Sequence, residues 1–410
     1  MARSSRREFL RTGAGVTVGL ALGTGFASPL VLRAQPKQVV ILGLWPFTGA
    51  FAEMGPVLER GMKMALEEHG MQIAGHAIRY VGRDSETNAQ AAARHAEEAV
   101  RTEGARYIIG PWSSSVALAV SDVAKRTKTL HYFSGGTDEI SGARCHRYSF
   151  QWAASPGVAA RTVVDQFAKA NPAAKRWYLL VADYAFGAAV EKQVRAAAQP
   201  HGVQIVGADR HPLGARAFAS QLTRATAAKP DVICLVNFGA DTVQSAREIA
   251  GAGLTPRLPL LVVWAGLEEL MQLTPEIRAN MWVGSNFYHT ADTPVAKHFT
   301  RQYREKHGSP PGYAPAAAYG MTRLVMRAME KARSIEVPDV IKTLEGLDAV
   351  DLLGRMSVDA RTHQTVRPYF FLRCKPKAQM KDAADVADIV AMTAIAPPRE
   401  ASACKDIGGF

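Results

Sequence analysis

The chain has 410 residues, a formal net charge of +12 and 21% charged residues. This length exceeds one ordinary domain and favours two. The Lys and Arg residues are scattered, and no nucleic-acid-binding motif accompanies them, so the charge predicts a solvated basic surface and excludes an RNA or DNA partner.

The first residues have the layout of an export signal. Ser5-Arg6-Arg7-Glu8-Phe9-Leu10-Arg11 carries a twin-arginine pair, and the uncharged apolar stretch 13–32 follows it. A membrane anchor is the alternative, but the stretch is Gly-rich and contains Pro29, whereas a spanning helix needs about 20 strongly apolar residues. We therefore expect residues 1–34 to be a twin-arginine signal peptide. Later segments are too short to span a membrane, so we expect a periplasmic protein.

Short apolar strands alternate with Ala-rich amphipathic helices in two series. The first series has predicted strands at 39–44, 77–81, 107–109 and 129–133, and helices at 57–69, 89–101 and from 114. The second has strands at 177–182, 203–207, 232–236 and 258–263, and helices at 187–199, 218–228 and 239–252. This alternation predicts βαβ units and parallel sheets covered on both faces.

Breaks in this rhythm indicate where the chain passes between the two series. Pro156 separates them, and residues 286–293 precede two further helices, at about 294–306 and 316–333, and a mostly β tail from Leu353. We expect an α/β protein with two Rossmann-like lobes and a cleft. Lobe 1 is predicted to comprise residues 37–155 plus 286–352, and lobe 2 residues 156–285 plus 353–410.

The sequence lacks the motifs of several enzyme classes. It contains no Gly-x-x-x-x-Gly-Lys-Ser/Thr phosphate loop, no His-Glu-x-x-His pair and no Gly-x-Ser-x-Gly elbow. The eleven His residues are dispersed, without metal-ligand spacing. We therefore expect no catalytic residue, no metal and no cofactor. A secreted α/β hydrolase or lyase is the less favoured alternative.

Four cysteines permit a disulfide in an oxidising compartment. Cys234 lies in a predicted buried strand and is expected to be a core residue. Cys374 and Cys404 flank the C-terminal segment and are the favoured pair, while Cys145 lies in a predicted loop and is expected to stay free.

Two loops that follow strands of the first series suit an anion. Residues 109–115 combine hydroxyl groups with the start of a helix, and residues 133–138 contain Gly135 and Gly136. A helix N-terminus offers unsatisfied N–H groups, and glycine lets a carboxylate approach the backbone. Helix capping by Ser113 or Ser114 and a plain turn at the glycines are the alternatives. The position of both loops at strand ends of one lobe favours binding.

Six loose motifs in one order resemble the type I periplasmic binding proteins of the branched-chain amino-acid transporter family. They are Pro46-Phe-Thr-Gly49, Gly110-Pro-Trp-Ser-Ser-Ser115, Ser134-Gly-Gly-Thr137, Asp183-Tyr-Ala-Phe-Gly187, Phe218-Ala-Ser-Gln-Leu222 and Gly251-Ala-Gly-Leu254. The resemblance covers nearly all of the chain after the signal. It implies a Venus-flytrap with lobes joined by three strands, acting as a monomer that delivers its ligand to an ABC permease and its ATPases.

The resemblance also implies a set of ligand-binding residues. The family's carboxylate site falls on Ser114, Gly136 and Thr137, with Trp112, Ser113 and Gly135 beside it. Phe186 and Phe238 match walls of the second lobe, and Met54 matches a side chain of the first lobe's pocket.

One departure from the family concerns the ligand's amine. Amino-acid binders place a carboxylate opposite the ammonium group, and the matching position here is Ala265. A buried ammonium without a counter-charge is costly, so we expect a carboxylate ligand without an amine, with an aromatic or apolar body against Trp112, Phe186, Phe238 and Trp264. If Glu268, Glu269 or Asp241 reaches the pocket, branched-chain amino-acid binding is the alternative; a periplasmic ligand sensor with the same fold is another.

Overall fold

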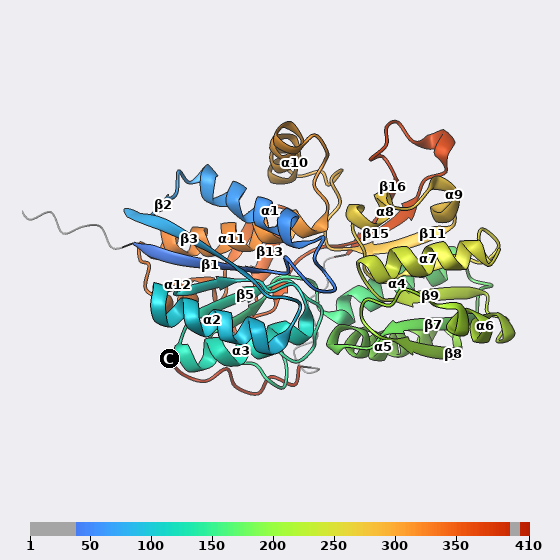
Figure 1. The fold of residues 1–410 in the computed structure, drawn as a ribbon, viewed down its shortest axis with the longest axis horizontal. Helices are drawn as coiled ribbons and strands as arrows, with labels where there is room; N and C mark the ends of the chain where they lie inside the picture. Colours follow the sequence, from blue (N-terminus) through green and yellow to red (C-terminus); the bar gives the residue numbers. More distant parts are fainter. Residues whose placement is uncertain (1–37, 394–401) are drawn as a thin grey trace, which may run out of the picture. The chain divides into compact units, whose positions relative to one another are not determined.

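The computed structural model describes residues 38–393 and 402–410. The predicted signal peptide, residues 1–34, lies outside these residues. Within them, no helix has the length and apolar character that crossing a bilayer requires. The described chain is built on two large sheets, each with helices on its faces (Figure 1).

The first sheet has six strands in the order β2-β3-β1-β4-β5-β6. The strands are β1 (Val39–Trp45), β2 (Gln72–Ile73), β3 (His76–Asp84), β4 (Tyr107–Ile109), β5 (Leu130–Phe133) and β6 (Ser149–Gln151). All pairs are parallel except β2 with β3. The helices that follow its strands are α1 (Gly55–Glu68), α2 (Ala89–Glu103) and α3 (Ser114–Thr127).

Alternate residues of β1 face two different layers of helices, as the two-residue period of a strand requires. Val39 and Ile41 pack in the same core as Leu58 and Met62 of α1. Val40, Leu42 and Leu44 pack instead with residues of α2 and α3, which are Ala92, Ala96, Ala99, Val116, Val120 and Val123. A strand buried on both faces has no polar side, which explains its continuous apolar sequence.

The second sheet has seven strands in the order β16-β15-β11-β10-β9-β7-β8. They are β7 (Arg176–Ala182), β8 (Gln204–His211), β9 (Val232–Val236), β10 (Leu260–Val262), β11 (Met281–Ser285), β15 (Tyr369–Cys374) and β16 (Ala387–Thr393). The first five are parallel, and β15 and β16 add antiparallel strands at one edge. The helices of this lobe are α4 (Pro156–Ala170), α5 (Ala185–Ala198), α6 (Ala219–Ala227), α7 (Ala240–Gly251), α8 (Leu267–Met271) and α9 (Pro275–Arg278).

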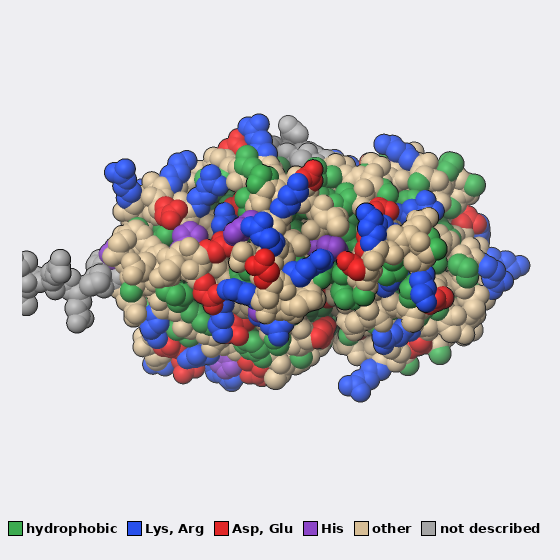
Figure 2. Space-filling view, turned by 90° about the horizontal axis from the view of Figure 1, so that it is seen from above, with side chains coloured by type: hydrophobic (Ala, Val, Ile, Leu, Met, Phe, Trp, Pro, Cys, Tyr) green, Lys and Arg blue, Asp and Glu red, His purple; other side chains and the backbone are tan. Residues whose placement is uncertain are grey.

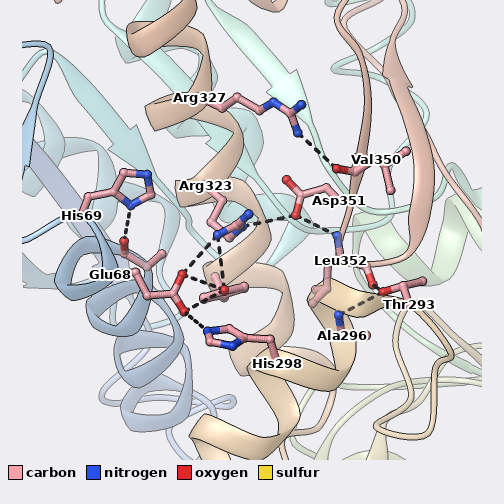
Figure 3. A network of polar contacts seen from close by, with 12 residues as sticks. Glu68, His69, Thr293, Ala296, His298, Arg323, Arg327, Val350, Asp351 and Leu352 are labelled. Atoms are coloured by element: carbon pink, nitrogen blue, oxygen red, sulfur yellow. Dashed lines mark hydrogen bonds and ion pairs between the residues drawn. The ribbon is translucent and has the colours of Figure 1, made fainter.

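The segment between β11 and β15 belongs with the first lobe. It comprises α10 (Pro294–His307), α11 (Tyr313–Ala332), α12 (Val337–Leu344) and a small sheet of β12 (Asp348–Asp351), β13 (Gly354–Val358) and β14 (Thr365–Val366). Figure 3 shows the polar network that joins α1, α10, α11 and β12. Glu68 of α1 accepts hydrogen bonds from the Tyr319 hydroxyl at 2.8 Å and Arg323 Nη1 at 3.1 Å, and His298 Nε2 lies 3.5 Å away. Arg323 Nε also donates to Asp351 Oδ1 at 3.3 Å.

This arrangement corrects one predicted boundary between the lobes. The expected division at residues 352/353 cuts the β12–β13 hairpin, in which Asp351 pairs with Gly354. Gln364, just before β14, is bridged to Gln151 of the first sheet. The chain therefore returns to the second sheet only at Tyr369, and the apolar turn at Leu352 and Leu353 is a hairpin turn rather than a domain boundary.

The predicted disulfide between Cys374 and Cys404 is wrong. Cys404 is joined to Cys145, with 5.6 Å between their Cα atoms, and Cys374 is buried and free in β15 of the second sheet. The C-terminal segment 402–410 lies against the first lobe, where Arg147 Nε donates to the Gly408 carbonyl and Ser402 Oγ donates to the Ser141 carbonyl. Sequence proximity misled the prediction, because Cys374 and Cys404 lie on different lobes. The predicted core position of Cys234 is confirmed.

Charged side chains are dispersed over the face shown in Figure 2, where Lys and Arg lie among Asp and Glu instead of forming one continuous basic patch. This distribution agrees with the expectation of a solvated basic surface.

The disulfide gives a first prediction. Because Cys145 and Cys404 are 259 residues apart, their bond restricts a long loop of the unfolded chain, and Cys145→Ser should lower the free energy of unfolding by about 4 kcal/mol. Urea unfolding with and without reductant measures this difference. Reductant should destabilise the wild type and leave a Cys145→Ser/Cys404→Ser double variant unchanged; an equal effect on both would contradict the assignment.

The network in Figure 3 gives a second prediction. Asp351 is 1% exposed and its Oδ2 atom has no partner among the described residues, so Arg323 is its counter-charge. Arg323→Gln should cost about 3 kcal/mol in urea unfolding, because it leaves a buried carboxylate unpaired. Arg327→Gln, four residues along α11 and exposed, removes only a bond to the Val350 carbonyl and should cost about 1 kcal/mol or less. Equal losses for both variants would refute the role of Arg323.

Candidate functional site

A cavity of about 260 Å³ lies where loops at the carboxyl ends of strands from both sheets meet. From the first lobe it is lined by Phe51, Trp112, Ser114, Ser134, Gly135, Gly136 and Tyr313, and from the second by Tyr184, Phe186, Phe238 and Trp264. Apart from Tyr313, the first residue of α11, these residues follow β1, β4, β5, β7, β9 and β10. Parallel sheets bind ligands beyond the carboxyl ends of their strands, which makes this cavity the candidate site.

A second hollow, of about 940 Å³, lies beside α4, α5 and the C-terminal segment. Its lining includes Asp138, Arg161, Lys192 and Asp359, and it contains none of the aromatic residues of the strand-end cavity. Its position away from the strand ends makes it the weaker candidate despite its size.

Aromatic rings from both lobes form the walls of the cavity. The ring of Phe186 packs edge-to-face on Trp264, with centroids 5.4 Å apart, and Trp112 of the first lobe lies 5.7 Å from Phe238 of the second. Tyr313 lies 4.9 Å from Trp112 and 6.3 Å from Trp264. Such offset and tilted pairs suit an apolar or aromatic ligand body.

Hydroxyl groups and glycines form the polar end of the cavity. Ser114 is the first residue of α3, and its Oγ donates to the Gly136 carbonyl at 3.2 Å. Ser134 Oγ lies 2.6 Å from the hydroxyl of Tyr313, and burial raises the pKa of Tyr313 well above its ordinary value. Both tyrosine and serine are therefore neutral donors at physiological pH. The start of α3 adds the positive end of a helix dipole, which favours a negative ligand group.

Gly136 is needed because rings of the second lobe lie directly against it. A Cβ atom at this position would lie 2.9 Å from Phe186 Cδ2 and 3.0 Å from Trp264 Cζ3. At Gly135 the same atom would lie 2.9 Å from Ser114 Oγ. Gly136 therefore lets the two lobes meet at the cavity, and Gly135 leaves room for Ser114 within the first lobe.

None of the described residues that line the cavity is Asp, Glu, Lys or Arg. The nearby acids make other contacts. Glu268 accepts from the N–H groups of Tyr313 and Ala314, Glu269 accepts from Gly266 N at 2.7 Å, and Asp241 accepts from Gly214 N at 3.1 Å. An amine in the cavity would thus have no carboxylate on the wall to pair with.

Six of the ten predicted ligand-binding residues line the cavity: Trp112, Ser114, Gly135, Gly136, Phe186 and Phe238. Ser113, Thr137, Met54 and Ala265 do not. Ser113 and Met54 occupy the N-cap positions of α3 and α1, Thr137 Oγ1 accepts from Glu139 N, and Ala265 is fully buried. Trp264, which was expected to form a wall of the cavity, lines it.

Phe51, Ser134, Tyr184 and Tyr313 line the cavity but were not predicted to. Ser134 and Tyr184 stand in motifs that the sequence singled out, and Phe51 follows the motif Pro46-Phe-Thr-Gly49 by two residues. Tyr313 lies far along the chain, and its signal was the run Pro310-Pro311-Gly312 before a helix. That helix begins at Tyr313, three residues before its predicted start, because Pro315 is tolerated in a first turn.

The arrangement can hold a small anionic group at one end and an apolar body at the other. Among the described residues no cluster of His, Cys, Asp and Glu could hold a metal ion. Two α/β lobes that meet around an aromatic cavity define a bilobal ligand-binding protein.

Comparison with known proteins gives the family. Residues 38–381 match the family model of periplasmic binding proteins. The chain belongs to this family, as a type I, Venus-flytrap member of the branched-chain amino-acid ABC transporter group. It is the periplasmic solute-binding component of an ABC transporter.

Individual relatives differ in their described ligands. The Leu/Ile/Val-binding protein homolog 4 of Brucella melitensis is 24% identical over 397 residues, covering 92% of each chain. An amino acid ABC transporter substrate-binding protein from Pseudomonas fluorescens Pf-5 is 30% identical, with a TM-score of 0.85 over 90% of this chain and 99% of that one. A solute-binding protein from Rhodopseudomonas palustris BisB5, solved with 3,4-dihydroxybenzoic acid, has a TM-score of 0.79 and 20% identity over 90% of this chain and 98% of its own.

The buried acid beside the Trp264 loop gives a third prediction. Burial, together with the neighbouring charge of Glu268, raises the pKa of Glu269 to about 8. The folded protein therefore holds this proton more tightly than the unfolded chain, and stability is lost as pH rises from about 4.5 to about 8, by at most about 1.4 kcal/mol per pH unit for one proton.

Glu269→Gln should flatten this pH dependence, because the amide can still accept from Gly266 N but does not ionise. Urea unfolding at pH 5, 6.5 and 8 measures the difference. Glu305→Gln, on the exposed face of α10, should leave the wild-type curve unchanged. Parallel curves for wild type and Glu269→Gln would show that Glu269 does not titrate in this window.

Proposed function

We propose that this protein binds a small aromatic carboxylate that lacks an amine and delivers it to the permease of its ABC importer. The observation that carries the proposal is the lining of the cavity, which combines aromatic walls, neutral hydroxyl donors and glycines with no charged side chain. Burying an ammonium there without a counter-charge would cost more than the aromatic contacts return.

The carboxylate would bind at the start of α3 and at the glycine turn. Ser114 would exchange its present bond to the Gly136 carbonyl for a bond to the ligand. Backbone N–H groups of a helix start and a charge-assisted hydroxyl bond are the strong donors for an oxyanion. The ring of the ligand would then lie between Trp112 and Tyr313 of the first lobe and Phe186 and Trp264 of the second.

Two findings support the choice of ligand, and one favours an alternative. Aromatic rings of both lobes line the cavity, which suits an aromatic body, and the R. palustris relative of similar fold was solved with a hydroxylated benzoic acid. The Brucella and Pseudomonas relatives, in contrast, carry amino-acid names. Branched-chain amino-acid binding is therefore the second candidate, and it requires Glu268 or Glu269 to leave its present contact.

Export and assembly complete the proposal. Residues 1–34 would direct export by the twin-arginine route, and the protein would act as a monomer without catalysis. Closure of the lobes around the ligand would present the surface that the permease recognises, as a shift between open and closed populations.

The fourth prediction is the outcome of a thermal-shift screen followed by calorimetry. Benzoate, hydroxybenzoates and cinnamate should stabilise the fold by about 2.7 kcal/mol at a hundred times their dissociation constant, and leucine and valine should not. Ser114→Ala should weaken carboxylate binding by roughly tenfold to a hundredfold, since it removes a bond to a charged group.

Two controls make this screen decisive. Ser220→Ala, on the exposed side of α6, should bind like the wild type. Benzamide, which keeps the ring and loses the negative charge, should bind weakly to both. Tight binding of leucine with no response to aromatic acids would overturn the proposed ligand class and would indicate that an acid reaches the cavity.

A further inference from the structure

A carboxylate of the second lobe holds the start of a helix of the first. Glu268 is on α8, and its two oxygens accept separate hydrogen bonds from Tyr313 N at 3.0 Å and Ala314 N at 3.1 Å. These are the first two residues of α11. The contact is half-buried and crosses the cleft directly beside the candidate site.

The start of α11 has no cap of its own. Gly312 occupies the N-cap position without a side chain, and Pro315, the third helical residue, has no N–H group. The N–H groups of the first turn have no partner within a helix and need an acceptor from outside. Glu268 supplies that acceptor for the two residues that precede the proline.

Glycine is needed at position 312 because the Glu268 carboxylate lies against it. The backbone conformation of Gly312 would not by itself require glycine. Its φ of −93° and ψ of −159° are accessible to any residue. A Cβ atom at this position would lie 1.9 Å from Glu268 Oε2, 2.1 Å from its Cδ and 2.3 Å from its Oε1. Alanine at this position would therefore displace the carboxylate from the helix.

The helix start that Glu268 holds is also part of the ligand site. Tyr313 lines the cavity, lies 2.6 Å from Ser134 Oγ through its hydroxyl, and packs against Trp112 and Trp264. Glu268 of the second lobe thus fixes the position of Tyr313, a cavity-lining residue of the first lobe. It can do so only while the two lobes are in contact.

Residues of the first lobe also contact the starts of helices in the second lobe. Ser115 Oγ of the first lobe accepts from Ala185 N, the first residue of α5, at 3.2 Å. The backbone N–H of Ala240, the first residue of α7, partly offsets the rise that burial gives to the pKa of Glu53 in the first lobe. Oxygens of each lobe therefore satisfy helix N-termini of the other.

We propose that Glu268 is a positioning residue that holds the lobes closed by accepting the first two N–H groups of α11, and so keeps Tyr313 at the ligand. The effect on bound ligand rests on the proposed function, because it needs a molecule in the cavity beside Tyr313. The effect on closure does not depend on the identity of that molecule.

Lobe closure can be measured with spin labels on cysteines introduced at Lys63 in α1 and Ser220 in α6, since Cys234 and Cys374 are buried. Electron–electron distance measurements should show a closed fraction in the ligand-free protein that Glu268→Ala and Gly312→Ala both lose. With whichever ligand the thermal-shift screen identifies, both variants should release it about tenfold faster in stopped-flow experiments, with little change in association rate. The Glu268→Ala/Gly312→Ala double variant should be no worse than either single variant, because both changes remove one contact.

Matched controls separate this contact from general effects. Glu305→Ala removes an exposed glutamate, and Gly251→Ala adds a methyl group at the end of α7 where no atom lies within 4 Å. Both should keep the wild-type distances and release rate. Wild-type distance distributions in Glu268→Ala and Gly312→Ala would overturn the proposal, and so would additive effects in the double variant. If the screen finds an amino acid instead of an aromatic acid, the proposed ligand class fails while the closure measurement still decides the role of Glu268.

Discussion

The parallel order of the strands is the constraint on which the rest of the molecule depends. Because parallel strands all end at the same edge, each lobe presents its connecting loops on one side. The chain crosses between the sheets at places that turn these two sides toward each other. Aromatic residues such as Trp112 and Trp264, far apart in sequence, therefore meet around one cavity.

Among the described residues, no Lys or Arg side chain pairs with the acids around this cavity. Glu268, Glu269 and Asp241 accept hydrogen bonds from backbone N–H groups, and Glu53 contacts the start of α7. A backbone donor has a fixed position, unlike a flexible Lys or Arg side chain, and so it defines the geometry of the contact more strictly. Each of these contacts keeps the carboxylate away from the wall of the cavity, whose described lining has no charged side chain.

Local patterns were sufficient to predict the lobes and most of the site. Continuous apolar runs predicted the strands, and the loops after them contained Trp112, Ser114, Gly136 and Phe186. Predictions that required knowing the direction of a side chain were weaker, since Ser113 and Thr137 stand next to lining residues but do not line the cavity. Tyr313 was missed because its helix begins before Pro315, and only the packing of α11 on α1 brings it to the cavity.

Long-range pairing was the least predictable feature. The predicted lobe boundary divided the hairpin of β12 and β13, because the apolar turn of this hairpin looked like the start of a new segment. The cysteines were paired by nearness in sequence, although strand order places Cys374 inside the second sheet. In both cases the outcome depends on which sheet a strand joins, and a single sequence contains little information about that choice.

The bond between Cys145 and Cys404 also has a topological effect. All the passages between the two large sheets that the structure describes lie between these two residues, so the lobes belong to one covalent ring. A protease that cuts the backbone once inside this ring opens it without releasing a fragment. The nicked molecule keeps both halves of its cleft joined until the disulfide is reduced.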